Sequence, residues 1–395
     1  MTWVANLVET MTGRIGTTLR MGAEGGWNWP INGVEEFDVT VSKKQLRELE
    51  PRWWTEFRTS VMISRVMNDG TLQPWMAGPI VEPPVETRGM ATLQCAGIGE
   101  LLARRVVLDR DYRPGEEEQL SSSMLPLTMR SYGTIMQDVV RSVTEGRLAG
   151  TIPMRYASPR QTGSRYFQRV YDGFNLRNNG AWKRLEELSK LEGGPDFQFR
   201  PEFVDERRTY MRWALFHGTA EQHAVAQEWT MDLDTTAARS PVSEIKVKSS
   251  AASRNNRAYI TGAGEGAGTL IRMAENVEQM EDGMPLLEYV GADSDSENAE
   301  LLLRKARTAV ELGAEAQTQI TATANLADAR TELGRWRVGD LAWLTLAEGE
   351  WLQVPGGRRR YRVIAAKGTW GSPTVTLEFQ ASRGAVGETE SSGEG

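Results

Sequence analysis

The two histidines of the sequence are the first residues to test for chemistry. His217 and His223 lie six positions apart around Gly218, beyond the last strand that the pattern predicts in the middle of the chain. A zinc site needs several cysteine, histidine or carboxylate ligands at characteristic spacings, and no cysteine or carboxylate spacing around this pair resembles one. The sequence also lacks the Gly-x-Ser-x-Gly turn that carries a serine nucleophile in many hydrolases. We therefore predict that both histidines are exposed loop residues and that no metal is bound.

The glycine-rich segment at residues 262–268 is a second candidate, because it superficially resembles a dinucleotide-binding loop. Gly262 and Gly264 would require a third glycine at position 267, which is Ala267, and Glu265 would repel a pyrophosphate. No strand–helix–strand unit with a later ribose-binding acid follows. We predict a hairpin tip or an irregular crossover here, and no cofactor.

A pair of carboxyl groups can cleave sugars when the surroundings of one group keep it protonated. Residues 116–118 are three glutamates in a polar loop, where nothing would raise the pKa of an acid. Asp232 and Asp234 alternate with Met231 and Leu233, as on the solvent side of a strand. The sequence therefore predicts no catalytic residue, and the chain is not expected to be an enzyme.

Charge and cysteine content argue against further classes of protein. The net charge of −7 argues against a general nucleic-acid binder, and the arginines at 358–360 are expected to be solvated. Cys95, the single cysteine, lies on the same side of an alternating run as Ala91 and Leu93, so it is expected in the core. We find no signal peptide and no run of about 18 apolar residues. Synthesis in a reducing cytoplasm is expected, without a membrane span.

The elements that would position any site are mostly strands in residues 1–110. Phe37, Val39 and Val41 alternate with polar residues, which indicates a half-buried strand. Residues 57–63, 72–80 and 91–95 are further predicted strands. Ser42 is the predicted N-cap of a short helix that ends before Pro51. These features predict an N-terminal domain that resembles a small antiparallel β-barrel.

Residues 111–228 are expected to form an α+β middle region. Residues 111–127 are polar and predict a linker or an exposed loop. Apolar residues at helical spacing predict helices over 131–143 and 181–191. Alternation predicts strands near 166–170, over 197–203 and over 209–216.

Residues 229–383 are expected to form a second barrel-like β domain, with an amphipathic helix inserted at 296–313. The predicted strands lie at residues 244–249, 257–261, 286–290, 317–326, 341–345, 360–365 and 374–379. Residues 384–395 are rich in glycine, serine and glutamate and predict a disordered acidic tail. The expected fold class is multi-domain α+β, with two antiparallel barrel-like domains flanking an α+β middle.

Thirteen tryptophans form an unusually large aromatic set. Five of them are candidates for the core or for an interface: Trp53, Trp54, Trp75, Trp336 and Trp351. Trp27 and Trp29 stand between two glycines and Pro30 and are candidates for a loop that faces a ligand such as a carbohydrate. An ordinary hairpin with one ring buried is the favoured interpretation.

Three segments resemble those of a known family. Residues 182–197 predict a helix that ends in a glycine turn and leads into a strand beginning Gly-Pro-Asp-Phe. Residues 255–262 resemble a strand that ends in glycine, and residues 337–341 resemble a Pro-Gly-Asp turn, with Arg337-Val338 in place of the proline. In this order they are similar to minor tail proteins of actinobacterial siphophages, mainly over residues 130–380. The N-terminal region matches by its strand pattern only.

This family is similar to the baseplate hub of contractile phages, and the resemblance implies a homotrimeric tail hub. Two barrel-like domains per subunit would form a pseudo-sixfold ring that joins a sixfold tail tube to a threefold tip. The implied partners are the distal tail protein, the tail tube protein, the tape measure protein and other minor tail proteins, with DNA in transit through the channel of the virion. A carbohydrate-binding module and a cell-wall hydrolase are the alternatives.

Overall fold

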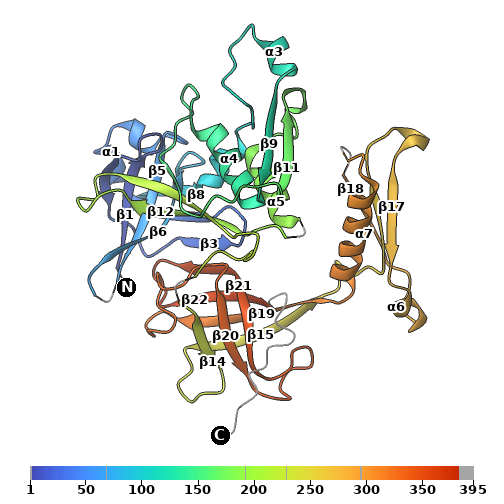
Figure 1. Cartoon of the computed structure of the whole chain (residues 1–395). Coiled ribbons are helices and arrows are strands. Elements are labelled where there is room, and N and C mark those ends of the chain that lie inside the picture. The colour runs from blue at the N-terminus through green and yellow to red at the C-terminus, as the bar shows by residue number, and fades with distance from the viewer. Residues whose placement is uncertain (1, 68, 192, 228, 294–295, 382–395) are drawn as a thin grey trace. The chain divides into compact units, whose positions relative to one another are not determined.

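The computed structural model describes residues 2–67, 69–191, 193–227, 229–293 and 296–381 (Figure 1). The chain divides into two compact units. Unit 1 comprises residues 1–245, 321–347 and 356–395, and unit 2 comprises residues 246–320 and 348–355. The described residues are mostly β, in several sheets, with few helices. The predicted tail at 384–395 lies outside the described residues.

The first sheet of unit 1 has four antiparallel strands in the order β2-β1-β5-β6. Its strands are β1 (Thr2–Glu9), β2 (Ile15–Leu19), β5 (Thr59–Val66) and β6 (Leu72–Pro79). β5 is central and is buried on both faces, since Val61, Met62 and Ile63 are all inaccessible to solvent. Helix α1 (Lys43–Arg47) begins at the predicted N-cap, where the hydroxyl of Ser42 accepts from the backbone N–H of Gln45. The short elements η1 (Pro51–Trp54) and α2 (Ile98–Ala103) complete this region.

A ten-stranded sheet joins the two ends of the chain. From the N-terminal part it takes β3 (Gly26–Pro30), β4 (Glu36–Ser42), β7 (Val85–Glu86) and β8 (Met90–Ala96). From the C-terminal part it takes β14 (Met231–Asp234), β15 (Val242–Ser250), β19 (Gln317–Asn325), β20 (Leu341–Leu346), β21 (Gly357–Thr369) and β22 (Thr374–Ala381). The long strand β21 pairs with β20, β22 and β3, and Ala366 lies opposite Trp29. Strands that we expected in two separate domains therefore share one sheet.

The expected barrels are not closed. Among the described strands, no succession of ladders returns to its first member. Two isolated bridges, Met21 to Val41 and Ile80 to Cys95, link the edges of the four-stranded sheet to β4 and β8. Pro79 is the last residue of β6, and the N–H of Ile80 after it donates to the carbonyl of Thr59 at 3.0 Å.

The middle region combines a three-stranded sheet, a two-stranded ribbon and helices. The sheet has the order β10-β13-β12, with β10 (Met154–Tyr156), β12 (Phe197–Phe203) and β13 (Met211–His217). Helices α4 (Tyr132–Thr144) and α5 (Ala181–Lys190) pack against each other (Figure 1). The apolar face of α4 is fully buried at the predicted positions Ile135, Met136, Val139, Val140 and Val143.

The prediction of a loop over residues 111–127 is wrong in its second half. Helix α3 (Glu117–Ser121) is followed by β9 (Met124–Arg130), which pairs with β11 (Phe167–Asp172). The turn η2 (Gly173–Asn175) follows β11. The partner of β9 stands some forty positions later in the chain, so local composition gave no sign of the pairing.

Unit 2 is built on a small sheet with the order β17-β16-β18. Its elements are β16 (Arg257–Thr261), η3 (Gly266–Gly268), β17 (Ile271–Glu275), α6 (Val277–Glu281), β18 (Glu288–Ala292) and α7 (Ala299–Gly313). Helix α7 lies on one face of the sheet, where Leu302 and Ala306 pack against Ile260 (Figure 1). The glycine-rich segment connects the antiparallel strands β16 and β17, as the hairpin interpretation predicted. No helix in the described ranges is long and apolar enough to cross a membrane.

Candidate interaction surfaces

Four tryptophans meet in the interior of unit 1. The ring of Trp75 on β6 stands edge-on to Trp27, Trp29 and Trp336, with centroids 5.5, 5.2 and 5.8 Å away. All four side chains are at most 4% exposed. Edge-to-face geometry at these distances adds to the free energy of burial. Trp75 and Trp336 are therefore core residues.

Trp27 and Trp29 do not form the candidate ligand-facing loop, and both rings are buried, whereas the hairpin interpretation expected one. Both lie in strand β3, where residues two apart point to the same side. That side faces Trp75, so the two rings pack together inward and are 4% and 3% exposed. Gly25 has a positive φ of 106°, and its Cβ position would lie 2.8 Å from the carbonyl oxygen of Asp38. The glycine thus permits a close approach of backbones beside β3 and does not mark an open loop.

The other predicted tryptophans are only partly buried. Trp53 lies in η1 with the guanidinium groups of Arg14 and Arg52 within 5.9 and 5.7 Å of its ring centroid. The indole N–H groups of Trp54 and Trp351 are enclosed, and neither has a hydrogen-bond partner in the described part of the chain. These three side chains remain candidates for an interface.

His217 is buried, contrary to the prediction that it is an exposed loop residue. It ends strand β13, is 2% exposed and lies 2.8 Å (Nε2) from the amide nitrogen of Gln137 on α4. Its Nδ1 lies 2.7 Å from the carbonyl oxygen of Gly218. Burial lowers the pKa of His217, so the ring is held neutral. His223 is exposed, and no group of three or more metal-ligating side chains occurs in the described ranges.

The acidic clusters have the environment of ordinary surface carboxylates. The backbone N–H of Arg113 and the guanidinium of Arg110 lower the pKa of Glu116. Asp232 is exposed on β14 beside buried Met231, as the alternation predicted. The pKa values of Glu116, Glu117 and Asp234 are lowered by hydrogen bonds, whereas the acid of a glycoside hydrolase requires a raised pKa.

One carboxyl group that sequence reasoning missed is buried. Glu35 follows the turn after β3 and is 9% exposed. Its backbone carbonyl accepts from the N–H of Gly97 at 2.7 Å, and a Cβ on Gly97 would meet the Glu35 carboxylate. Burial raises the pKa of Glu35 to about 7. Nothing in the sequence separates it from the exposed Glu36 beside it.

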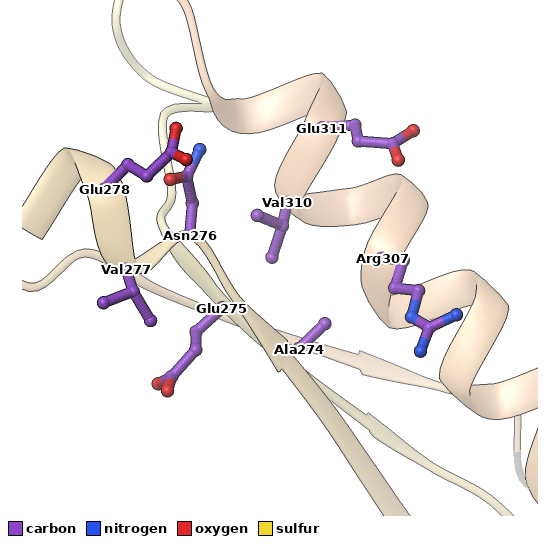
Figure 2. Close-up of a pocket in the computed structure, with 8 residues that line it drawn as sticks. All are labelled: Ala274, Glu275, Asn276, Val277, Glu278, Arg307, Val310 and Glu311. Carbon is purple, nitrogen blue, oxygen red and sulfur yellow. The ribbon is translucent and has the colours of Figure 1, made fainter.

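One hollow of the described structure lies in unit 2. Figure 2 shows it between the end of β17, helix α6 and helix α7, and its volume is about 420 Å³. Its lining includes Glu275 and Glu278 next to β17 and α6, and Arg307, Val310 and Glu311 on α7. It encloses no arrangement of acid, base and nucleophile.

The face of the unit 2 sheet opposite α7 is exposed. Ladder register places Tyr259 between Met273 and Val290, which are 48% and 68% exposed. The next row places Arg257 between Glu275 and Glu288, at 2.8 and 3.8 Å from their carboxylate oxygens. Apolar and acidic side chains thus share one open face, which we call the unit 2 face.

The fold resembles those of proteins with solved structures. No protein-family model and no curated protein sequence matches this chain. The structure aligns with the tail protein from Neisseria meningitidis MC58 with a TM-score of 0.54 and 11% identity, over 96% of this chain and 97% of that chain. It aligns with the 43 kDa tail protein of prophage MuSo2 from Shewanella oneidensis with a TM-score of 0.54 and 9% identity, over 96% and 98%. The chain therefore has the fold of these two tail proteins.

Proposed function

We propose that this chain is a structural hub protein at the tip of a bacteriophage tail. The observation that carries the proposal is the extent of the fold match, which covers 96% of this chain and nearly the whole of two tail proteins. The whole chain, and not one module of it, thus has a tail-protein fold.

In this proposal the protein is a homotrimer that adapts a sixfold tail tube to a threefold tip. Residues 1–110 and 229–383 supply two β regions per chain, around an α+β middle at 111–228. Three chains would then offer six similar β surfaces to the tube, through the head-to-tail contacts that a ring requires. The pairing of β3 with β21 supports it, because it holds the two regions in one body.

The remaining parts of the proposal concern location and partners. The chain would belong with minor tail proteins of actinobacterial siphophages and lie in the virion, at the tail tip. Its partners would be the distal tail protein or tail tube protein, the tape measure protein and other minor tail proteins. It would take part in host attachment and in DNA delivery, with no enzymatic activity.

The mass of the purified protein tests the proposal. Light scattering should give a mass three times that of a single chain, which is 44.0 kDa. Addition of purified tail tube protein should produce tubes that carry the protein at one end in electron micrographs. A monomer that also fails to cap tubes would refute the hub. A zymogram on bacterial cell walls should be blank, and a cleared band would favour a hydrolase.

A carbohydrate-binding module gains no support from the described structure. The two tryptophans that suggested it, Trp27 and Trp29, have their rings packed inside unit 1. Glycan-array binding by the intact protein is expected to be at background.

A further inference from the structure

We infer that the unit 2 face binds an amphipathic helix of another protein, with an apolar stripe that ends in lysine or arginine. The face is the outer side of a three-stranded sheet whose inner side is already covered by α7. Its outward residues form three cross-strand rows: Ile271-Thr261-Ala292, Met273-Tyr259-Val290 and Glu275-Arg257-Glu288. Two rows are mainly apolar and the third is acidic overall.

The apolar rows are too exposed to be explained by packing within the chain. Ile271, Met273 and Val290 are 49%, 48% and 68% exposed. By contrast, Ala258 and Ile260, on the α7 side of β16, are 0% and 5% exposed. A contiguous apolar face on a small sheet typically marks a binding surface.

The inner side of the same sheet shows what kind of element fits. There α7 presents Leu302, Ala306 and Val310, at helical spacing, to strands whose side chains alternate. Residues four apart lie on one face of a helix, so such a stripe can follow the two apolar rows. A helix on the outer side would bury Tyr259 and its two neighbours as α7 buries Ile260.

The charge of the third row determines which end of the partner helix must be basic. Arg257 is the one cation of the third row, and the carboxylates of Glu275 and Glu288 flank it. Lysine or arginine on the partner would meet these carboxylates, because opposite charges across an interface favour correct pairing.

The charge of unit 2 also argues against a second copy of the same face as the occupant. Residues 246–320 and 348–355 hold eight lysines and arginines and fourteen aspartates and glutamates, a net charge of −6 out of the chain's −7. Two such faces brought together would repel each other. The inference stands on this face alone and does not require the chain to form a trimer.

Fluorescence polarisation with the intact protein tests the inference. The probe is a capped, labelled helical peptide with a leucine and alanine stripe ending in lysines, and its matched peptide has glutamates in place of the lysines. The wild-type chain should bind the lysine peptide at least about tenfold more tightly than the glutamate peptide. Val290→Asp should weaken binding about tenfold or more, because it places a charge in the apolar row. Leu352→Asp, at an apolar residue of unit 2 that is fully exposed and outside the sheet, is the control and should bind as the wild type does.

Further variants separate the outcomes. Ile271→Thr is a milder change on the same face and should weaken binding even if Val290→Asp disturbs folding, which circular dichroism reports. Glu288→Lys should reduce the preference for the lysine peptide. Equal binding of both peptides by the wild type, or equal loss in Leu352→Asp and Val290→Asp, would overturn the inference. Concentration-dependent self-association that Val290→Asp abolishes would also overturn it, since a second copy would then occupy the face. A chain that binds the peptide but is a monomer and fails to cap tubes would support the face and refute only the hub.

Discussion

Replacing Glu35 by glutamine is expected to stabilise the protein at neutral and alkaline pH and to have little effect at acid pH. The carboxyl group of Glu35 is buried, and its pKa is raised from the ordinary value of 4.5 to about 7. A tenfold change in acid dissociation corresponds to about 1.4 kcal/mol, so the ionised form in the folded protein costs roughly 3 kcal/mol. Glutamine has the same shape and carries no charge, so it avoids this cost.

The pH dependence follows from the direction of the shift. The folded protein binds the proton of Glu35 more tightly than the unfolded chain does. Its favourable contribution is therefore fully present below pH 4.5 and is lost as the pH rises towards about 7. Above that pH the difference between the wild type and Glu35→Gln should be constant at its largest value.

Urea unfolding followed by tryptophan fluorescence is a suitable assay, because the tryptophan cluster lies in the same unit as Glu35. The free energy of unfolding would be measured at several pH values between about 4 and 8. The control is Glu36→Gln, next to it and exposed, which should leave the pH profile unchanged. Parallel profiles for the wild type and Glu35→Gln would show that the carboxyl is hydrated or paired in solution, and the reasoning would fail.

Three further predictions concern the interior of unit 1 and use the same unfolding assay. Trp75→Ala should lower the free energy of unfolding by about 3–5 kcal/mol, because it removes the ring that contacts three other tryptophans. Trp53→Ala, at a partly exposed ring, should lower it clearly less, and equal losses would contradict the packing. Arg65→Met should destabilise by about 1–3 kcal/mol because it leaves the enclosed Leu333 carbonyl without its donor and removes one of two cations beside Glu332, which keeps Arg335 at 3.2 Å. Adding Glu332→Leu should recover part of the loss, and a double variant no better than the single one would count against the ion pair. Gly78→Ala should cost about 1–3 kcal/mol because its Cβ would meet the Ala96 carbonyl, while Gly89→Ala, with open space around it, is the control and should be nearly neutral.

The sequence predicted those parts of the fold whose pattern is local. The N-cap at Ser42, the buried stripe of α4 and the alternation around Asp232 all depend on residues within one or two turns or one strand. Cys95, expected in the core from alternation in its own strand, is 4% exposed. In each case the repeat of the helix or strand decides which side chains are buried.

Features that depend on distant partners could not be predicted in this way. β9 is a strand because β11 pairs with it, and His217 is buried because Gln137 comes from a helix eighty positions earlier. Trp27 and Trp29 look like loop residues beside two glycines until β21 and Trp75 are in place. Whether the expected barrels close likewise depends on which sheet edges pair with each other, and the alternation of side chains along a strand does not identify its pairing partner.

The fold match limits what can be transferred from the two tail proteins to this chain. At 9–11% identity about nine positions in ten differ, so the alignment preserves the course of the backbone and the alternation of buried residues, but not particular surfaces. A core tolerates such exchange because many apolar residues fill similar volumes. A docking face does not, because its partner depends on individual exposed side chains such as Met273, Val290 and Glu288. The choice of neighbours in an assembly must therefore be determined from this chain's own surfaces, and the unit 2 face is where exposed apolar side chains and unbalanced charge coincide.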